Sequence, residues 1–189
     1  MTISSFLILG LAAGCSQPAV TGPDSQTQEG NGVKSHGALR VEGASLCDEN
    51  GNPVVLRGMS SHGISWYPRY LNGGAMKTLK EYGANLFRIA AYTEPSGAYL
   101  ENPGRTLDYL YMGAESALAE DLYVILDWHI LNDSDPNEHI EEAKDFFDQL
   151  SAHYADEPGI LYEICNEPNG DVTWEQISAY AEEVIPVIR

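Results

Sequence analysis

The stretch LYVILDW, residues 122–128, decides the fold class. It is nearly continuous in apolar residues, which is typical of a parallel strand that is covered on both faces. Three further short apolar segments lie at residues 54–59, 85–91 and 160–165. Segments with a helical period separate these strands, so the chain predicts four successive β-then-α units.

The sequence predicts the buried face of two of the helices. Apolar residues step by three and four along residues 140–154 and again along residues 174–188, which places them on one face of each helix. Asp135, Pro136 and Glu138 resemble the N-cap, first-turn proline and capping carboxylate of the first of these helices.

The segment ENGN, residues 49–52, predicts a β-hairpin upstream of these units. It separates two apolar runs, and Asn50 and Gly51 suit the positive backbone dihedrals of a tight turn. We therefore expect one strand of the hairpin on either side of it.

The order of strands and helices implies a parallel sheet with right-handed crossovers, either an open sheet or part of a (β/α)8 barrel. Polar residues gather directly behind the strands, where both architectures place their sites. These groups are SSHG at 60–63, RIAAYTE at 88–94, DWHILND at 127–133 and NEPNG at 166–170. No glycine-rich phosphate-binding loop follows a strand, so the barrel is favoured.

The composition excludes several classes of partner. With 189 residues, 43% of them hydrophobic, the chain is long enough for one globular domain with a substantial core. The formal net charge is -18 and only ten residues are Lys or Arg, so we expect no nucleic-acid partner. There is no HExxH, CxxC or GxSxG pattern, and the segment at 133–144 lacks the glycine of a calcium loop. Neither a metal nor a cofactor is expected.

The N-terminal residues predict export. The apolar run at residues 6–13 is too short to span a bilayer and indicates a signal sequence. LAAGC at residues 11–15 resembles a bacterial lipobox, in which Cys15 would be lipidated, although no Lys or Arg precedes the apolar run. A cleaved signal without lipid, or a buried N-terminal strand or helix, are the alternatives.

Three regions are expected along the chain. Residues 1–15 form a signal peptide of the lipoprotein type, and residues 16–36, which are nearly free of large apolar groups, form a flexible linker. Residues 37–189 form the folded domain. The protein is expected to be secreted or on the cell surface, with a lipid anchor to a bacterial membrane as one outcome.

Glu167 is the strongest candidate for a catalytic residue. It follows the fourth apolar segment, so its carboxylate is expected to project into a partly desolvated mouth and to act as a general acid. Beside it, the Asn166 amide can bond a substrate hydroxyl, while Pro168 fixes the exit of the chain. Two structural alternatives stay open: Glu167 caps the next helix, or it belongs to an ion pair.

Arg88 and His129 are weaker candidates for residues of the functional site. Arg88 lies within the second apolar segment, where a charge is costly unless it is paired. Glu163 and Asp127 are the partners that a structural ion pair would use. His129 follows the third segment and, taken alone, is more typical of a satisfied hydrogen-bonding residue.

The groups behind the strands carry a resemblance to a known family. In order and spacing, they are similar to the strand-end motifs of glycoside hydrolase family 5, in its bacterial endo-β-1,4-glucanase (cellulase) branch. The motifs are LRGMSSHG at 56–63, LFRIAAYTE at 86–94, YVILDWHIL at 123–131 and YEICNEPNGDVTW at 162–174. The likeness runs from about residue 38 to residue 189 and implies the first four β/α units of a (β/α)8 barrel, preceded by the hairpin.

The resemblance also implies roles for the residues. It identifies a retaining endo-β-1,4-glucanase that hydrolyses internal bonds of cellulose or related β-glucans. Glu167 would be the proton donor, Asn166 would contact the 2-hydroxyl of the sugar, and Arg88 would lie beside the nucleophile. The residues that would bind substrate are His62, Trp66, Tyr67, Tyr92 and His129. Core packing is the alternative for the aromatic residues, and it fits Trp128 better than Trp66 or Tyr67.

The second carboxylate of such an enzyme is not found among these motifs. In the family the nucleophilic glutamate ends the seventh strand, whereas this sequence ends in the fourth helix, so we expect a partial chain that is inactive alone. When full length, it is expected to be a monomer that binds β-1,4-glucan. The alternatives are a β-mannanase or other β-glycanase of the same family, or a non-catalytic glucan-binding lipoprotein fragment.

Overall fold

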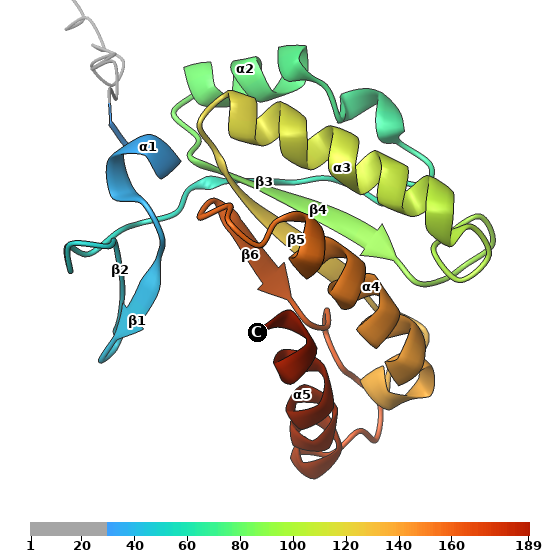
Figure 1. The fold of residues 1–189 in the computed structure, drawn as a ribbon. Helices are drawn as coiled ribbons and strands as arrows, with labels where there is room; N and C mark the ends of the chain where they lie inside the picture. The colour runs from blue at the N-terminus through green and yellow to red at the C-terminus, as the bar shows by residue number, and fades with distance from the viewer. Residues whose placement is uncertain (1–29) are drawn as a thin grey trace, which may run out of the picture.

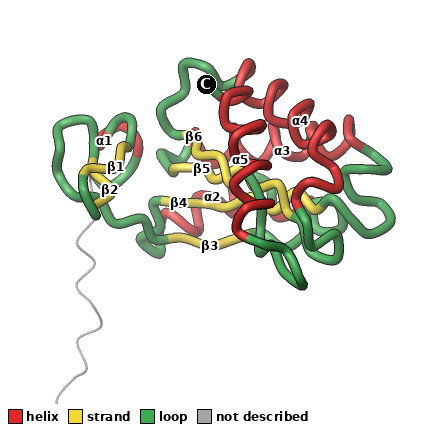
Figure 2. Tube along the Cα trace, turned by 90° about the horizontal axis from the view of Figure 1, so that it is seen from below, coloured by secondary structure: helices red, strands yellow, loops and turns green. Residues whose placement is uncertain are grey.

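The computed structural model describes residues 30–189. A small unit with a two-stranded antiparallel sheet lies beside a larger α/β layer, and the two are set apart in both Figure 1 and Figure 2. The elements in chain order are α1 (Val33–His36), β1 (Arg40–Glu42), β2 (Ser45–Cys47), β3 (Gly58–Ser60), η1 (Pro68–Tyr70), α2 (Gly73–Glu81), β4 (Leu86–Tyr92), α3 (Pro103–Ala119), β5 (Tyr123–His129), η2 (Pro136–His139), α4 (Ile140–His153), β6 (Ile160–Glu163) and α5 (Trp174–Ile188).

The larger layer is built on one parallel sheet, in which β3, β4, β5 and β6 lie in sequence order. A helix follows each strand, which confirms the four predicted β-then-α units. The register places Arg88 of β4 opposite Ser60 of β3, and Asp127 of β5 opposite Glu163 of β6. Asp127 lies opposite Ala90, two residues beyond Arg88, so the four polar side chains share one face of the sheet.

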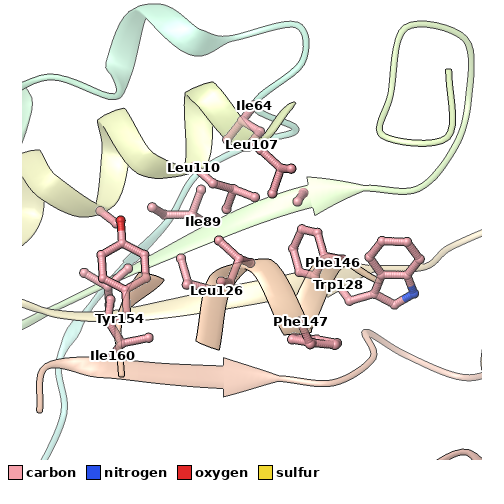
Figure 3. Packing of buried hydrophobic residues seen from close by; sticks show 14 of the residues in the cluster. Ile64, Ile89, Leu107, Leu110, Leu126, Trp128, Phe146, Phe147, Tyr154 and Ile160 are labelled. Carbon is pink, nitrogen blue, oxygen red and sulfur yellow. The ribbon is translucent and has the colours of Figure 1, made fainter. Parts of the chain in front are cut away.

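The hydrophobic core lies between this sheet and its helices (Figure 3). Leu126 and Trp128 of β5 pack there with Phe146 and Phe147 of α4, and all four side chains are fully buried. Because successive side chains of a strand point to opposite faces, Asp127 is turned away from the core. Burial of the apolar residues thus decides which polar residues reach the other face of the sheet.

β3 is shorter than the strand predicted at 54–59, and the side chain of Asn85 explains the difference. Its Oδ1 accepts a hydrogen bond from the backbone N–H of Arg57 at 2.6 Å, and its Nδ2 donates to the carbonyl of Val55 at 3.0 Å. The Asn85 side chain therefore bonds the backbone of Val55 and Arg57, and the regular strand ladder begins only at Gly58. The other three strands begin and end within two residues of their predicted bounds.

The predicted turn at ENGN is present, with a positive φ at Gly51, but no regular strand follows it. The hairpin of two regular strands lies just before it, where β1 pairs with β2 around Gly43, whose φ is +61°. The ENGN segment forms a second turn, closed by a single bridge between Cys47 and Pro53. There the Asp48 carboxylate accepts hydrogen bonds from the backbone N–H groups of Asn50 and Asn52.

Acid is expected to weaken the fold through Asp48. The hydrogen bond from the Asn52 backbone is the main cause that lowers the pKa of Asp48 to about 2, while burial acts in the opposite direction. A carboxyl whose pKa is lower in the folded state stabilises the fold above its unfolded pKa of about 4 and loses this contribution as the pH falls toward 2. The free energy of unfolding, measured with urea between about pH 5 and pH 2, should therefore decline less steeply in Asp48→Asn than in the unmodified chain. Equal declines in the two proteins would contradict the stabilising role of Asp48.

The folded unit begins before Gly37, which corrects the expected linker. Residues 33–36 form α1, and the backbone N–H of Lys34 donates to the Asp121 carboxylate at 2.8 Å. The carbonyl of Asn31 accepts from Asn85 Nδ2 at 3.0 Å. Residues 31–36 thus belong to the domain, and the signal peptide, Cys15 and the rest of the linker lie outside the described residues.

The helix starts follow local hydrogen bonds. Asp135 is an N-cap, as predicted, but it caps the short helix η2 by accepting from the Asn137 backbone at 3.0 Å, and α4 begins only at Ile140. α5 begins with a capping box between Thr173 and Gln176 that the sequence analysis did not single out. Within residues 30–189, no helix is both long and apolar enough to cross a bilayer.

Candidate active site

Arg88 is the centre of the polar face of the sheet. Its Nε and Nη2 donate to the two oxygens of the Glu163 carboxylate, each at 2.7 Å. Nη2 also lies 2.8 Å from Asp127 Oδ2, and Nη1 donates to the Ser60 hydroxyl at 3.1 Å. Both ion pairs that the sequence offered as alternatives are therefore present, and the hydrogen bonds to Glu163 raise the pKa of Arg88 further above its ordinary value.

Asp127 connects Arg88 to His129. Its side chain is fully buried, and Oδ2 lies 2.6 Å from Nδ1 of His129. Burial raises the pKa of Asp127 above its ordinary value, while the hydrogen bond to His129 and the charge of Arg88 act against this rise. Because Nδ1 is held by the carboxylate, Nε2 is the nitrogen of His129 that is left to contact a ligand.

Asn166 is buried at the end of this network. Its Oδ1 accepts from Arg88 Nη2 at 3.0 Å, and its Nδ2 donates to the carbonyl of Ile130 at 3.0 Å. The backbone N–H donates to the carbonyl of Trp128 at 3.1 Å. These contacts fix the plane of the amide, and one N–H of the Nδ2 group stays available for a substrate hydroxyl.

Glu167 is exposed in the described chain, which corrects the expectation of a partly desolvated mouth, and its carboxylate is unengaged. Within residues 30–189 the carboxylate makes neither a hydrogen bond nor an ion pair. It does not cap the next helix either, since Thr173 and Gln176 cap α5. The two structural roles that the sequence left open for Glu167, a helix cap and an ion pair, are thus absent from the described chain. The backbone of Glu167 has a φ of +35°, which lies in the left-handed region.

The predicted aromatic residues form one cluster around Tyr92. The ring of Tyr92 lies 3.9 Å from His129 and 5.4 Å from Trp66, measured between centroids, and it is parallel to His62 at 6.2 Å. Tyr67 joins through His62 at 5.0 Å. Trp66 and Tyr67 are 37% and 43% exposed, so they are surface rings, as expected.

Gly63 allows Trp66 to take its place in this cluster. A Cβ atom at position 63 would collide with the six-membered ring of Trp66 and would lie 3.0 Å from the Tyr92 ring. Any larger residue at position 63 must therefore displace the indole.

Two residues of this region were not predicted from the sequence. Ser60 bonds Arg88, and its position opposite that residue in a parallel ladder could have indicated the contact. Asn169 donates to the carbonyls of Glu167 and Leu131, and the second of these partners is distant in sequence. Groups of three or more His, Cys, Asp or Glu that could hold a metal are absent from residues 30–189.

Comparison with known proteins identifies the family of the chain. The family model described as Cellulase (glycosyl hydrolase family 5) matches residues 47–189. The chain belongs to glycosyl hydrolase family 5. The resemblance drawn from the strand-end motifs is therefore confirmed.

Relatives of this family 5 chain include bacterial endoglucanases. Endoglucanase A of Butyrivibrio fibrisolvens is 46% identical over 162 residues, which are 83% of this chain and 38% of that protein. Endoglucanase E-5 of Thermobifida fusca is 45% identical over 170 residues, which are 88% of this chain and 36% of that protein. The chain thus spans well under half of these relatives.

Solved structures confirm the fold class. The catalytic domain of Thermobifida fusca endoglucanase Cel5A matches with a TM-score of 0.81 and 44% identity, over 85% of this chain and 52% of that domain. A variant of that domain has been solved in complex with cellotetraose. These neighbours are (β/α)8 barrels, so β3 to β6 and their helices correspond to about half of a barrel.

Proposed function

We propose that the complete protein is a retaining endo-β-1,4-glucanase in which Glu167 is the general acid and base. The observation that carries this proposal is the free carboxylate of Glu167 just beyond β6, beside the fixed amide of Asn166. In a family 5 barrel the carboxyl ends of the strands form the catalytic face. Cellulase and endoglucanase names among the relatives support a β-glucan as the substrate.

The proposed reaction has two steps. In the first, Glu167 gives its proton to the bridging oxygen while a second carboxylate attacks the anomeric carbon, so that the glycosidic bond breaks and a glycosyl–enzyme forms. In the second, Glu167 takes a proton from water, which attacks the anomeric carbon and releases the second carboxylate. The amide of Asn166 and Nε2 of His129 would hold the sugar hydroxyls during both steps.

We propose that the second carboxylate comes from a segment outside these 189 residues. A retaining enzyme needs its two carboxyl groups about 5 to 5.5 Å apart. Asp127 and Glu163 are the acidic residues of the described polar face, and both are bound to Arg88. Either of them would have to give up its ion pair with Arg88 in order to attack the sugar. Arg88 would lie beside the incoming carboxylate and keep it ionised.

The aromatic cluster would bind the glucan chain. Trp66 and Tyr67 present exposed ring faces, on which the apolar faces of pyranose rings can stack. Tyr92 and His62 add polar groups beside them. The same cluster would suit a β-mannanase or another β-glycanase, and it is also the feature that favours a glucan-binding protein without activity.

The test compares this chain with the polypeptide extended by the downstream reading frame, each assayed for new reducing ends on soluble β-glucan and on β-mannan. We expect cleavage of β-glucan by the extended protein alone, and slower cleavage of mannan. Activity in the 189-residue chain would contradict the external nucleophile. Binding without cleavage by the extended protein would favour the non-catalytic alternative.

The lipid anchor at Cys15, the cell-surface location and the monomeric state stay predictions. Cys15 lies outside the described residues. Globomycin-sensitive processing and labelling with a palmitate analogue in a bacterial host would test the anchor, with Cys15→Ser as the control.

A further inference from the structure

The backbone of Glu167 is held in a conformation that a glutamate rarely adopts. Its φ of +35° places it in the left-handed region, where the Cβ of any residue other than glycine is crowded. Such a residue keeps this conformation only when its surroundings enforce it. Something in the described structure must therefore hold the chain at this point.

The side chain of Asn169 provides that support. Its Nδ2 donates to the carbonyl of Glu167 at 3.0 Å and to the carbonyl of Leu131 at 3.1 Å. Its Oδ1 accepts from the Ser134 hydroxyl at 3.1 Å, and its backbone N–H donates to the carbonyl of Ser134 at 3.2 Å. One residue thus ties the loop after β6 to the loop after β5.

The partners also fix the orientation of the Asn169 amide. Two carbonyl oxygens can only accept, so the nitrogen must face Glu167 and Leu131. The Ser134 hydroxyl then holds the oxygen end. Both donors of the amide are satisfied, and the residue that holds the Glu167 carbonyl is itself held by Ser134, which is 35 residues from Asn169 in the sequence.

We propose that Asn169 is a positioning residue for the general acid: by holding the carbonyl of Glu167 against the loop after β5, it keeps the Glu167 carboxyl aimed at the glycosidic oxygen. This inference rests on the proposed function of Glu167. Asn169 itself need not touch the substrate. Its contribution passes through the backbone of Glu167, two residues earlier.

The proposal has a chemical signature that general loss of structure does not share. Protonation of the leaving oxygen matters for a poor leaving group such as phenol and hardly matters for 2,4-dinitrophenol, which departs as a stable anion. The value of kcat/KM reports the first, glycosyl-transfer step. A misdirected Glu167 should therefore affect phenyl β-cellobioside far more than 2,4-dinitrophenyl β-cellobioside.

The experiment measures kcat/KM for both glycosides in the extended enzyme and in its Asn169→Ala variant. We expect a loss of about 10- to 100-fold for the phenyl glycoside, since a misplacement of about 1 Å can cost that much. For the dinitrophenyl glycoside the loss should be less than about threefold, because its departure needs no proton. Ser134→Ala, which frees the oxygen end of the amide, should show a smaller loss with the same selectivity.

Asn137→Ala is the matched control. Asn137 is also a loop asparagine that bridges two segments, since its Nδ2 donates to Asp135 and to the carbonyl of Gln176, but it does not contact Glu167. It should leave the ratio of the two kcat/KM values unchanged. Thermal unfolding of every variant separates a local effect from loss of the fold.

A crystal structure of the extended enzyme with Asn169→Ala gives a readout that does not depend on activity. We expect residue 167 to leave the positive-φ region. An unchanged φ, or equal losses on both glycosides, would overturn the positioning role. A wild-type extended enzyme that cleaves neither glycoside would instead refute the proposed function.

Discussion

Glu167→Gln in the extended enzyme is expected to lower kcat/KM for phenyl β-cellobioside by about 10³-fold, within the range typical of general acid catalysis. The amide has nearly the shape of the carboxyl group but cannot give its proton to the bridging oxygen. For 2,4-dinitrophenyl β-cellobioside the first step should survive, whereas kcat should fall because no base then activates water. Initial rates on both substrates measure the two effects.

Azide separates the acid and base roles of Glu167. As an anion it attacks the glycosyl–enzyme without a base, so it should restore turnover of the dinitrophenyl glycoside in the Glu167→Gln variant and yield a glycosyl azide. Asp171→Asn removes an exposed carboxyl four residues later and should leave all rates unchanged. If Glu167→Gln retained full activity on the phenyl glycoside, the assignment of the acid would be wrong.

Arg88→Met is expected to have the largest effect on stability, about 3 kcal/mol or more in the free energy of unfolding. Methionine keeps much of the side-chain length but leaves the carboxylates of Asp127 and Glu163 close together without their cation. The Asp127 side chain is fully buried and that of Glu163 is 32% exposed, so solvent can compensate only in part. Urea unfolding followed by circular dichroism gives the difference.

Arg40→Met is the control for Arg88→Met. Arg40 and Glu42 form a hydrogen-bonded pair at 2.6 Å, but their side chains are 49% and 47% exposed. Exposed pairs contribute between about 0 and 1 kcal/mol. A loss of similar size in the two variants would show that the network around Arg88 does not stabilise the sheet.

The fold was predictable because buried strands and helix faces appear in the sequence as regular patterns of apolar residues. Three of the four strands were located to within two residues, since their apolar runs are bounded by turns. β3 was misplaced because the side chain of Asn85 replaces backbone partners, and no apolar pattern reports a side-chain amide. The turn at Gly51 was predicted, but the turn at Gly43, which also has a positive φ and joins the two regular strands, was not.

The candidate site was predictable as a set of residues but not as a network. Glu167, Asn166 and Arg88 were recognised from their places at or within strands. That Arg88 binds Glu163 and Asp127 together depends on the strand register, which one sequence does not specify. The φ of Glu167 and the bonds of Asn169 were out of reach, because they depend on contacts with the loop at residues 131–134.

Gly63 has a consequence for how the aromatic rim formed by Trp66 and Tyr92 can vary. The site tolerates no side chain beneath the indole of Trp66, so position 63 is closed to the other amino acids while that ring keeps its place. Diversification of this rim must then arise through the exposed rings themselves or through neighbouring loops. A protein engineer can therefore move the indole from position 63, and that change would shift one of the rings proposed to stack on the sugar.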